Sequence, residues 1–302
     1  MEAFALVMLG FAPGVFWLWL IYQRDRYIPA PVYLVVRTFL WGMAVSVPVV
    51  VVETLLLVVG GFGLGTDPAE GRLALHEAAF TSFVVAGMTE ELAKYLVLRK
   101  TIQSSPYFRQ PLDGIIFSAA AALGFASIEN VGYMFSFGAA VILSRGPFTT
   151  VAHVLFASVF GYSTGARKIG KVRSYVVPLS VLLAMGLHGL FDFLLLSDPP
   201  RWPLAIGLFL AMGVLFLGML KLAQRQSPYR GKVAAILVTC PKCAHRSGYG
   251  ASFCTACGQS LALARTGPVF LCGQCNSLAE RHHQFCTSCG SRLDRKLVSA
   301  SS

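Results

Sequence analysis

The 302-residue chain is 55% hydrophobic, holds only 13% charged residues and has a mean hydropathy of +0.64. This balance excludes an ordinary soluble domain and indicates a protein that crosses a membrane several times. The formal net charge of +11 does not by itself indicate a nucleic-acid-binding protein, because many basic residues stand beside apolar stretches, as the positive-inside rule predicts for membrane proteins.

The first apolar stretch is not typical of a signal peptide. Glu2 precedes it instead of a basic segment, and no small-residue cleavage site is evident, so we expect an uncleaved helix. Six more stretches of near-spanning length follow, the fifth overall being the shortest. We therefore predict an all-α polytopic membrane protein with about seven transmembrane helices, with six or eight as alternatives. The expected spans are residues 3–22, 40–60, 78–98, 112–135, 149–165, 176–196 and 203–222.

Basic residues in the short loops predict how these helices are oriented. The loops after the first, third, fifth and seventh spans are rich in Lys and Arg, whereas the loops between them hold few. Because basic loops stay in the cytoplasm, we expect the N-terminus outside and the C-terminal tail in the cytoplasm. The basic set is Arg24, Arg26, Arg37, Arg99, Lys100, Arg109, Arg167, Lys168, Lys171, Arg173, Lys221, Arg225, Arg230 and Lys232, against Arg72, Arg145 and Arg201 in the other loops.

Two adjacent carboxylates and a lysine interrupt the third span. Glu90, Glu91 and Lys94 follow a mostly apolar run that begins at Ala78. A charge at this depth costs about 2.5 to 3.5 kcal/mol to insert, so such residues usually face the interior of a helix bundle and mark a functional site. In a helix, Lys94 lies one turn from both Glu90 and Glu91, and we expect it to neutralise part of their charge.

The next three spans also carry polar side chains. At 1.5 Å per residue, their acids and histidines and Glu90 are expected at similar depth, from about the midplane to the outer third. Such a set is hard to explain by helix packing alone. It comprises Glu129 and Asn130 in the fourth span, His153 in the fifth, and His188 and Asp192, one turn apart, in the sixth.

These residue types suit hydrolysis. A glutamate can act as general base on a water while a histidine polarises the carbonyl, or the set can hold a divalent metal whose bound water attacks. Ion or proton transport uses the same residue types, and a non-catalytic scaffold or sensor is a further alternative. Glu53, in the second span, has no evident partner and is interpreted as structural. The candidate catalytic-metal ligands are Glu90, Glu129, His153, His188 and Asp192.

Four short motifs follow one another on successive spans. They are Glu90, Glu91 and Lys94; Phe125, Glu129 and Asn130; His153 and Phe156; and His188 and Asp192. In this order they resemble the PrsW family of intramembrane proteases, which is related to the CAAX prenyl endopeptidase and bacteriocin-processing superfamily. The resemblance covers roughly residues 30–225. It implies a metallo- or glutamate-dependent endopeptidase of the bacterial cell membrane, which cuts membrane-tethered proteins such as anti-sigma factors near the extracytoplasmic side.

The tail after residue 239 carries all eight cysteines in two repeated sets. Each set reads Cys-x-x-Cys, ten residues, Cys-x-x-Cys, which is close to the spacing of a zinc ribbon. A unit this short cannot bury a core, so a bound metal would supply its folding energy. Disulfides are disfavoured because a cytoplasmic tail stays reduced. The expected ligands of two structural zinc ions are Cys240, Cys243, Cys254 and Cys257, then Cys272, Cys275, Cys286 and Cys289.

The chain therefore divides into three parts. We expect a transmembrane protease domain over residues 1–223, a polar linker over 224–238 and tandem zinc ribbons over 239–302. Zinc ribbons bind nucleic acid or protein. The basic residues of the tail are scattered rather than clustered, which is a weak signal for phosphate binding. We therefore expect the ribbons to serve regulation or docking to a cytoplasmic protein partner.

Overall fold

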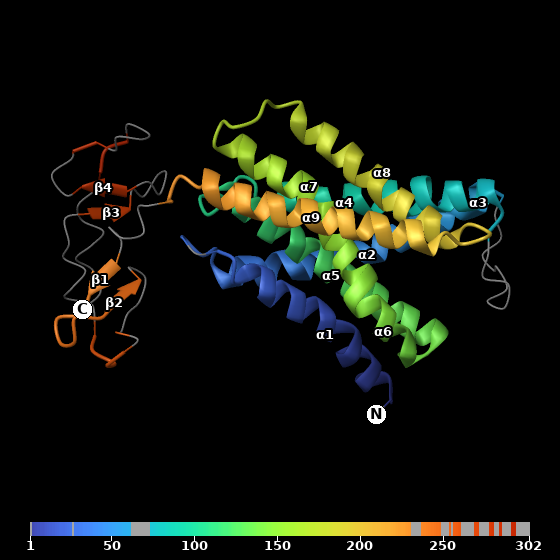
Figure 1. Cartoon of the computed structure of the whole chain (residues 1–302), viewed down its shortest axis with the longest axis horizontal. Helices are drawn as coiled ribbons and strands as arrows, with labels where there is room; N and C mark the ends of the chain where they lie inside the picture. The colour runs from blue at the N-terminus through green and yellow to red at the C-terminus, as the bar shows by residue number, and fades with distance from the viewer. Residues whose placement is uncertain are drawn as a thin grey trace. The chain divides into compact units, whose positions relative to one another are not determined.

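The chain forms two compact units, Met1–Pro228 and Tyr229–Ser302 (Figure 1). The structure is a computed structural model. It describes residues 2–25, 27–61, 73–230, 237–248, 254, 256–260, 269–271, 278–280, 284–285 and 291–293.

In its described part, the first unit consists of helices joined by loops, with one isolated bridge between Leu73 and Ser197. Six of its helical segments are long and apolar enough to cross a membrane, and a seventh, more highly charged segment runs through α3, η1 and α4. This confirms the predicted all-α membrane fold. The elements are α1 (Glu2–Tyr22), α2 (Val32–Val59), α3 (Leu75–Ala79), the π-helix η1 (Phe80–Met88), α4 (Thr89–Thr101), α5 (Pro111–Phe137), η2 (Ala139–Val141), α6 (Ile142–Ser144), η3 (Arg145–Thr149), α7 (Thr150–Lys168), α8 (Val176–Leu196) and α9 (Trp202–Gln226).

Helix α2 begins at Val32 rather than near residue 40. Pro31 immediately precedes it, and the residues that follow are mostly apolar, so nothing in this stretch stops the helix. Arg37, which the sequence suggested as a loop residue, consequently lies within α2. Its Nη2 donates a hydrogen bond to the carbonyl of Thr101 at 2.7 Å, which ties α2 to the end of α4.

Helix α5 is the centre of the bundle, packed against α1, α2 and α7 (Figure 1). In its most apolar 18-residue stretch, 94% of the residues are buried. Small residues permit this close packing: a Cβ on Gly114 would lie 2.0 Å from the carbonyl oxygen of Gly161 in α7, and one on Gly124 would lie 2.0 Å from that of Phe39 in α2. Because α5 is enclosed, the polar residues near its end are held inside the bundle.

The π-helix η1 immediately precedes the charged turn of α4. π-helical segments widen a helix locally and occur frequently at functional sites. Close approach to α8 is possible here because a Cβ on Gly87 would meet the carbonyl oxygen of Met185 at 2.6 Å, and one on Gly189 would meet Phe83 at 2.5 Å. This contact brings the first turn of α4 beside the middle of α8.

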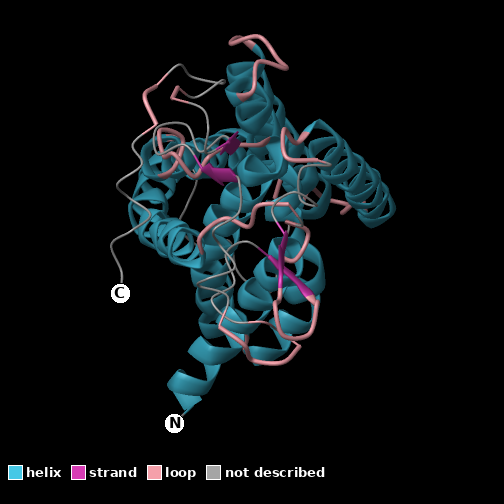
Figure 2. Cartoon of the chain, turned by 90° about the vertical axis from the view of Figure 1, so that its left-hand side faces the viewer, coloured by secondary structure: helices cyan, strands magenta, loops and turns pink. Residues whose placement is uncertain are grey.

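The described part of the second unit contains two short antiparallel hairpins, whose strands are magenta in Figure 2. Strand β1 (Leu237–Thr239) pairs with β2 (Arg246–Gly248), with Val238 opposite Ser247. Strand β3 (Val269–Leu271) pairs with β4 (Leu278–Glu280), with Phe270 opposite Ala279. A two-stranded hairpin is marginally stable in water by itself, so both hairpins need a further source of stability.

Candidate active site

Lys94 lies at the centre of a buried polar cluster. Its side chain is fully buried, and its Nζ donates hydrogen bonds to Glu90 Oε2 at 2.9 Å and Glu91 Oε1 at 2.8 Å. The same Nζ lies 2.8 Å from His153 Nδ1, and it sits 4.6 Å from the centre of the Phe125 ring. An ammonium group only donates hydrogen bonds, so His153 Nδ1 is an acceptor here and the ring proton is on Nε2.

Glu129 of α5 contacts an arginine and a histidine. Its Oε2 lies 2.9 Å from His153 Nε2, and its Oε1 lies 2.8 Å from Arg145 Nη2. The Nε of Arg145 donates a hydrogen bond to Asn130 Oδ1 at 2.9 Å, and its guanidinium stacks 3.7 Å from the centre of the Tyr133 ring. Glu129 is therefore fixed between η3 and α7 and oriented toward His153.

Asn130 connects this arrangement to the start of α7. The side chain is fully buried, and its Nδ2 donates a hydrogen bond to Thr150 Oγ1 at 2.9 Å. With its oxygen accepting from Arg145, Asn130 holds three segments together. Its contacts are those of a residue that positions Arg145 and Glu129.

His188 of α8 completes the cluster from the opposite side. Its Nδ1 lies 2.9 Å from Glu91 Oε1 in a hydrogen bond, and its Nε2 lies 3.3 Å from Asp192 Oδ2, one helical turn away. The ring stacks on Phe156 with centroids 5.1 Å apart and meets the edge of His153 at 5.3 Å. The two histidines therefore lie side by side between the carboxylates.

Every membrane residue that the sequence singled out around Glu90 thus belongs to one connected set. Glu53, for which the sequence showed no partner, accepts a hydrogen bond from Thr89 Oγ1 at 3.1 Å and so lies next to this set. Arg145 was expected in an outer loop, but it is buried in η3. It is the one charged residue of residues 131–150, and a lone charge in an apolar stretch was the signal that could have identified it.

A cavity of about 180 Å³ opens beside the cluster. Its polar wall is formed by residues from α5, η3, α7 and α8, and its apolar wall includes Phe156, Phe191 and Leu195. The side chains of Glu129 and Asp192 are 23% and 26% exposed, whereas those of Glu90 and Glu91 are 8% and 0% exposed. The polar residues that line the cavity are Glu129, Tyr133, Arg145, Thr149, His153, His188 and Asp192.

The cluster also offers ligands for a metal. One ligand atom from each of Glu90, Glu91, His153 and His188 lies within 4.8 Å of the others, and imidazole with carboxylate is a donor set that zinc accepts. Glu91 Oε2 is buried without a hydrogen-bond partner, which leaves an acceptor available. The residues fit a divalent ion in type and spacing, and Lys94 is the cation that competes with it for the two carboxylates.

Two residues named as ligands from the sequence lie further out. Glu129 contacts His153 and Asp192 contacts His188, each at the Nε2 of the ring. In a metal site, carboxylates in such positions orient the histidine ligands rather than bind the ion. The group of four closely spaced ligands includes Glu91 and does not include Glu129 or Asp192.

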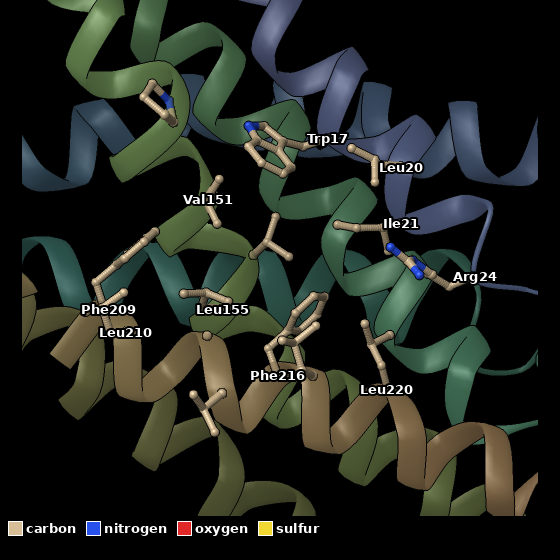
Figure 3. Close-up of a pocket in the computed structure, with 15 residues that line it drawn as sticks. Trp17, Leu20, Ile21, Arg24, Val151, Leu155, Phe209, Leu210, Phe216 and Leu220 are labelled. Carbon is tan, nitrogen blue, oxygen red and sulfur yellow. The ribbon is translucent and has the colours of Figure 1, made fainter. Parts of the chain in front are cut away.

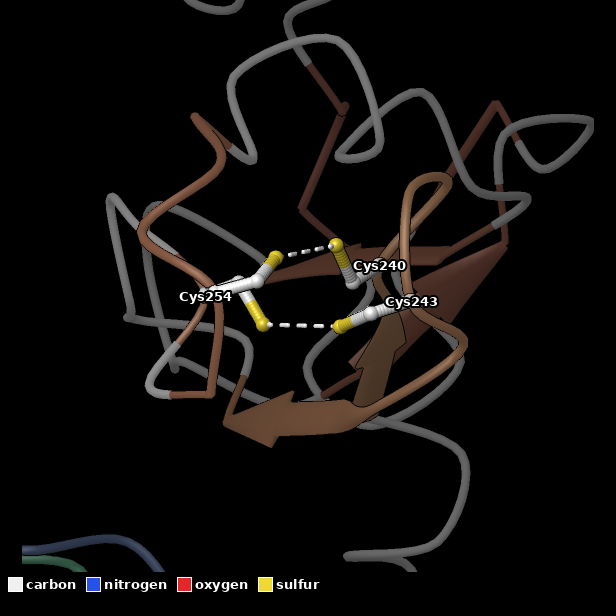
Figure 4. A group of neighbouring side chains, drawn as sticks. Cys240, Cys243 and Cys254 are labelled. Carbon is white, nitrogen blue, oxygen red and sulfur yellow. Dashed lines mark hydrogen bonds between the residues drawn. The ribbon is translucent and has the colours of Figure 1, made fainter.

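A second cluster, in the tail, consists of cysteines (Figure 4). The Sγ atoms of Cys240 and Cys257 are 3.6 Å apart, as are those of Cys243 and Cys254, and all four lie within 4.8 Å of one another. Tetrahedral zinc with bonds of about 2.3 Å separates its sulfur ligands by about 3.8 Å. The four cysteines are free thiols and fit one zinc ion.

The backbone around these cysteines repeats itself. Ala244 and Gly258, each four residues after a cysteine, have φ of 57° and 70° and donate hydrogen bonds to Cys240 and Cys254 respectively. Although burial opposes it, the N–H groups of Ala256 and Cys257 lower the pKa of the Cys254 thiol to about 6. The thiolate that zinc requires is therefore favoured. The second expected set lies outside the described residues: Cys272, Cys275, Cys286 and Cys289.

Comparison with known proteins agrees with both clusters. The chain matches the family described as PrsW family intramembrane metalloprotease over residues 30–220 and the family described as Double zinc ribbon over residues 240–294. It is 34% identical over 208 residues to Protease PrsW of Geobacillus kaustophilus, covering 68% of this chain and 86% of that relative. It is 35% identical over 214 residues to Protease PrsW of Clostridioides difficile, covering 68% and 84%.

Protease PrsW of Bacillus subtilis is 29% identical over 194 residues, which cover 64% of this chain and 83% of that relative. No solved structure matches the chain.

Proposed function

Because the chain belongs to the PrsW family of intramembrane metalloproteases and is a membrane-embedded peptidase, we propose that it cuts membrane-tethered proteins at the cavity beside His153 and His188. Single-span proteins of the anti-sigma-factor kind are the substrate class we favour, with the cut near the extracytoplasmic side. The observation that carries the proposal is the convergence of ionisable side chains from four helical segments on one small cavity. Such groups are costly within a membrane and are retained where they act.

We assign Glu90 as the general base. Glu90 is slightly accessible, whereas Glu91 is fully buried and bonded to His188, so Glu90 is better placed to take a proton from an attacking water. Lys94 donates a hydrogen bond to each of the two carboxylates and so offsets part of their charge. Glu91 then has a positioning role, because it holds the ring of His188 toward the cavity.

We assign His188 as the hydrogen-bond donor to the oxyanion of the substrate. The contact of its Nε2 with Asp192 is long, at 3.3 Å, and a substrate carbonyl oxygen entering the cavity can replace it. A donor placed there stabilises the charge that develops on this oxygen as the water attacks. Lys94 donates to both Glu90 and His153 Nδ1, so the proton that Glu90 takes can pass through Lys94 to Nδ1 while Nε2 gives its own proton to the leaving amine.

A divalent metal would be held by Glu90, Glu91, His153 and His188 and would supply an activated water at neutral pH. Glu90 would then serve as a ligand instead of a free base. In either route, His188 faces the scissile carbonyl and the side chains around the cavity exclude bulk water.

The test is cleavage of a single-span reporter in membranes that contain the full-length protein. We expect Glu90→Gln to abolish cleavage while insertion and abundance stay normal. Glu77→Gln is the matched control, since Glu77 is an acid of the same helical segment outside the cluster, and it should leave cleavage intact. Normal cleavage by Glu90→Gln would overturn the assignment, and cleavage by neither the wild-type nor the control protein would return the transporter and scaffold alternatives.

The natural substrate would emerge from a comparison of membrane proteomes. Cells with the wild-type protein should lose the outer part of one membrane protein that cells with Glu90→Gln retain. An identical set of intact membrane proteins in both would contradict the proposed protease role.

We further propose that residues 1–223 form the protease domain, 224–238 a linker and 239–302 a pair of zinc ribbons on the cytoplasmic side of the bacterial cell membrane. The alternating basic loops support this orientation. The ribbons would bind two zinc ions and dock a cytoplasmic protein. Labelling of single cysteines introduced at each end with a membrane-impermeant reagent tests the orientation, since only the N-terminal one should react in intact cells.

A further inference from the structure

A second cavity, of about 540 Å³, lies between α1, α7 and α9 (Figure 3). Pro147, Val151, Val154 and Leu155 line it, whereas Thr149, Ala152, His153 and Phe156 line the active-site cavity. These two sets alternate along the helix and therefore lie on different faces of it. The larger cavity is separated from the active site by α7.

Hydrogen bonds hold the walls of this cavity at both ends. Near one end, Trp17 Nε1 donates to the carbonyl of Gly146 at 3.1 Å, which ties α1 to η3. Near the other, Gln224 Nε2 of α9 donates to the carbonyl of Arg24 at 3.0 Å. Between these two ties the helices stay apart and enclose a groove, which is pre-formed rather than a transient gap.

The walls of the groove are apolar. Trp17, Leu20 and Ile21 of α1 face Phe209, Phe216 and Leu220 of α9 across it (Figure 3). All three helical segments are of membrane-spanning length and composition, so the surrounding solvent is lipid and a hydrocarbon chain is the natural filling. The volume falls within the range of ordinary ligand sites.

One end of the groove is basic. Among the described residues that line it, Arg24 alone carries a charge, and its side chain extends from the turn after α1 toward the groove (Figure 3). Lys221 and Arg225 flank the α9 residues that close this end. The carboxylate of the neighbouring Asp25 is buried and accepts hydrogen bonds from Ala30 and Gln110, so it is not the counter-ion of Arg24.

We propose that the groove binds one anionic phospholipid, with an acyl chain between α1 and α9 and the headgroup at Arg24. Basic residues at the end of an apolar cleft between transmembrane helices are the chemistry that selects such lipids. The bound lipid fastens α1 to the bundle where the protein itself leaves a gap. The site is independent of the proposed proteolysis, because none of its lining residues belongs to the catalytic cluster.

The chain offers a matched pair of variants for the test. Gly213 lines the groove, and a Cβ there meets open space. Gly207, which precedes it in the same helix α9, has equally open space but does not line the groove. Gly213→Phe therefore fills the groove, and Gly207→Phe adds the same side chain elsewhere. The measurement is native mass spectrometry of the detergent-purified full-length protein, titrated with phosphatidylglycerol or with phosphatidylcholine.

We expect the wild-type protein and Gly207→Phe to retain one phosphatidylglycerol molecule and Gly213→Phe to lose it. Arg24→Gln should weaken phosphatidylglycerol binding by roughly fivefold and leave phosphatidylcholine binding unchanged, while Arg99→Gln should change neither. Should Gly213→Phe fail to fold, the arginine pair decides.

Equal retention of the two lipids, equal loss in both glycine variants, or an Arg24→Gln protein that binds like the wild type would each overturn the proposal. Unchanged lipid binding by Gly213→Phe, together with lost reporter cleavage, would overturn it in favour of a substrate segment in the groove. Loss of lipid with cleavage absent from every protein would sustain the lipid site and count only against the proposed protease function.

Discussion

Arg145→Gln is the perturbation that examines the site most directly, because the sequence did not place this residue in it. The side chains of Arg145 and Glu129 are 8% and 23% exposed, with 2.8 Å between Nη2 and Oε1. Removal of one partner of a buried ion pair costs about 3 to 5 kcal/mol, since the other charge is left uncompensated. We expect the lower end of this range because Glu129 is partly accessible. Released from Arg145, Glu129 also orients His153 less well, which typically costs about 10- to 100-fold in activity.

The assay combines reporter cleavage with thermal unfolding in detergent. Arg145→Gln should lower kcat with little change in KM, and Arg145→Lys should restore little, because an ammonium cannot bond Glu129 and Asn130 and also stack on Tyr133. If Arg145 acts through Glu129, adding Arg145→Gln to a Glu129→Gln protein should cause little further loss of cleavage. Arg173→Gln, at an exposed loop arginine, is the control. Wild-type stability and cleavage in Arg145→Gln would refute this reasoning.

Three further outcomes are expected. His188→Ala should reduce cleavage by about 10² to 10³, the cost of losing an oxyanion donor, whereas Asp192→Ala should reduce it by about 10 to 100 if it only orients the ring; the reverse order in measured kcat would contradict both assignments. Elemental analysis of the full-length protein should find at least two zinc ions, and Cys254→Ser should remove one of them; disulfides in place of zinc would contradict the ribbon. Burial, and then the nearby Asp113 carboxylate, raise the pKa of Asp25 from 3.8 to about 7. The folded protein thus binds a proton that the unfolded chain releases near its ordinary pKa, so stability falls as the pH rises from about 4 to 7, by a few kcal/mol at most. Asp25→Asn should flatten this dependence in thermal unfolding at pH 5 and pH 8, and an unchanged slope would exclude Asp25 as its source.

The sequence predicted the membrane fold and the polar cluster well because both follow from local rules. Hydropathy and length identify spans, and the helical repeat brings Lys94 to Glu90 and Glu91 whatever the tertiary structure. The start of α2 was missed because Arg37 resembles a loop charge, although its guanidinium reaches the carbonyl of Thr101. The π-helix η1 was also missed, since its register depends on close packing against α8 and not on a sequence signal of its own.

Arg145 shows where loop counting fails. A charge between two spans was assigned to the aqueous loop, yet it lies buried because Glu129, Asn130 and Tyr133 together satisfy its guanidinium. The same three contacts explain why η3 folds back into the bundle. The depth of such a residue depends on partners from different helices. Dividing a single sequence into spans does not reveal which residues those partners are.

The charges of the cluster give a reason for its composition. Among the described residues, two permanently cationic side chains contact the cluster: Lys94 pairs with Glu90 and Glu91, and Arg145 pairs with Glu129. Asp192 contacts His188. Unbalanced negative charge is costly within a membrane, so further positive charge has to come from protons on His188 or the carboxylates, or from one divalent ion. The histidines lie between the carboxylates, where either solution is in reach. The cluster is thus built to take up and release positive charge beside a cavity, which is what hydrolysis with a glutamate base or with a metal-bound water requires.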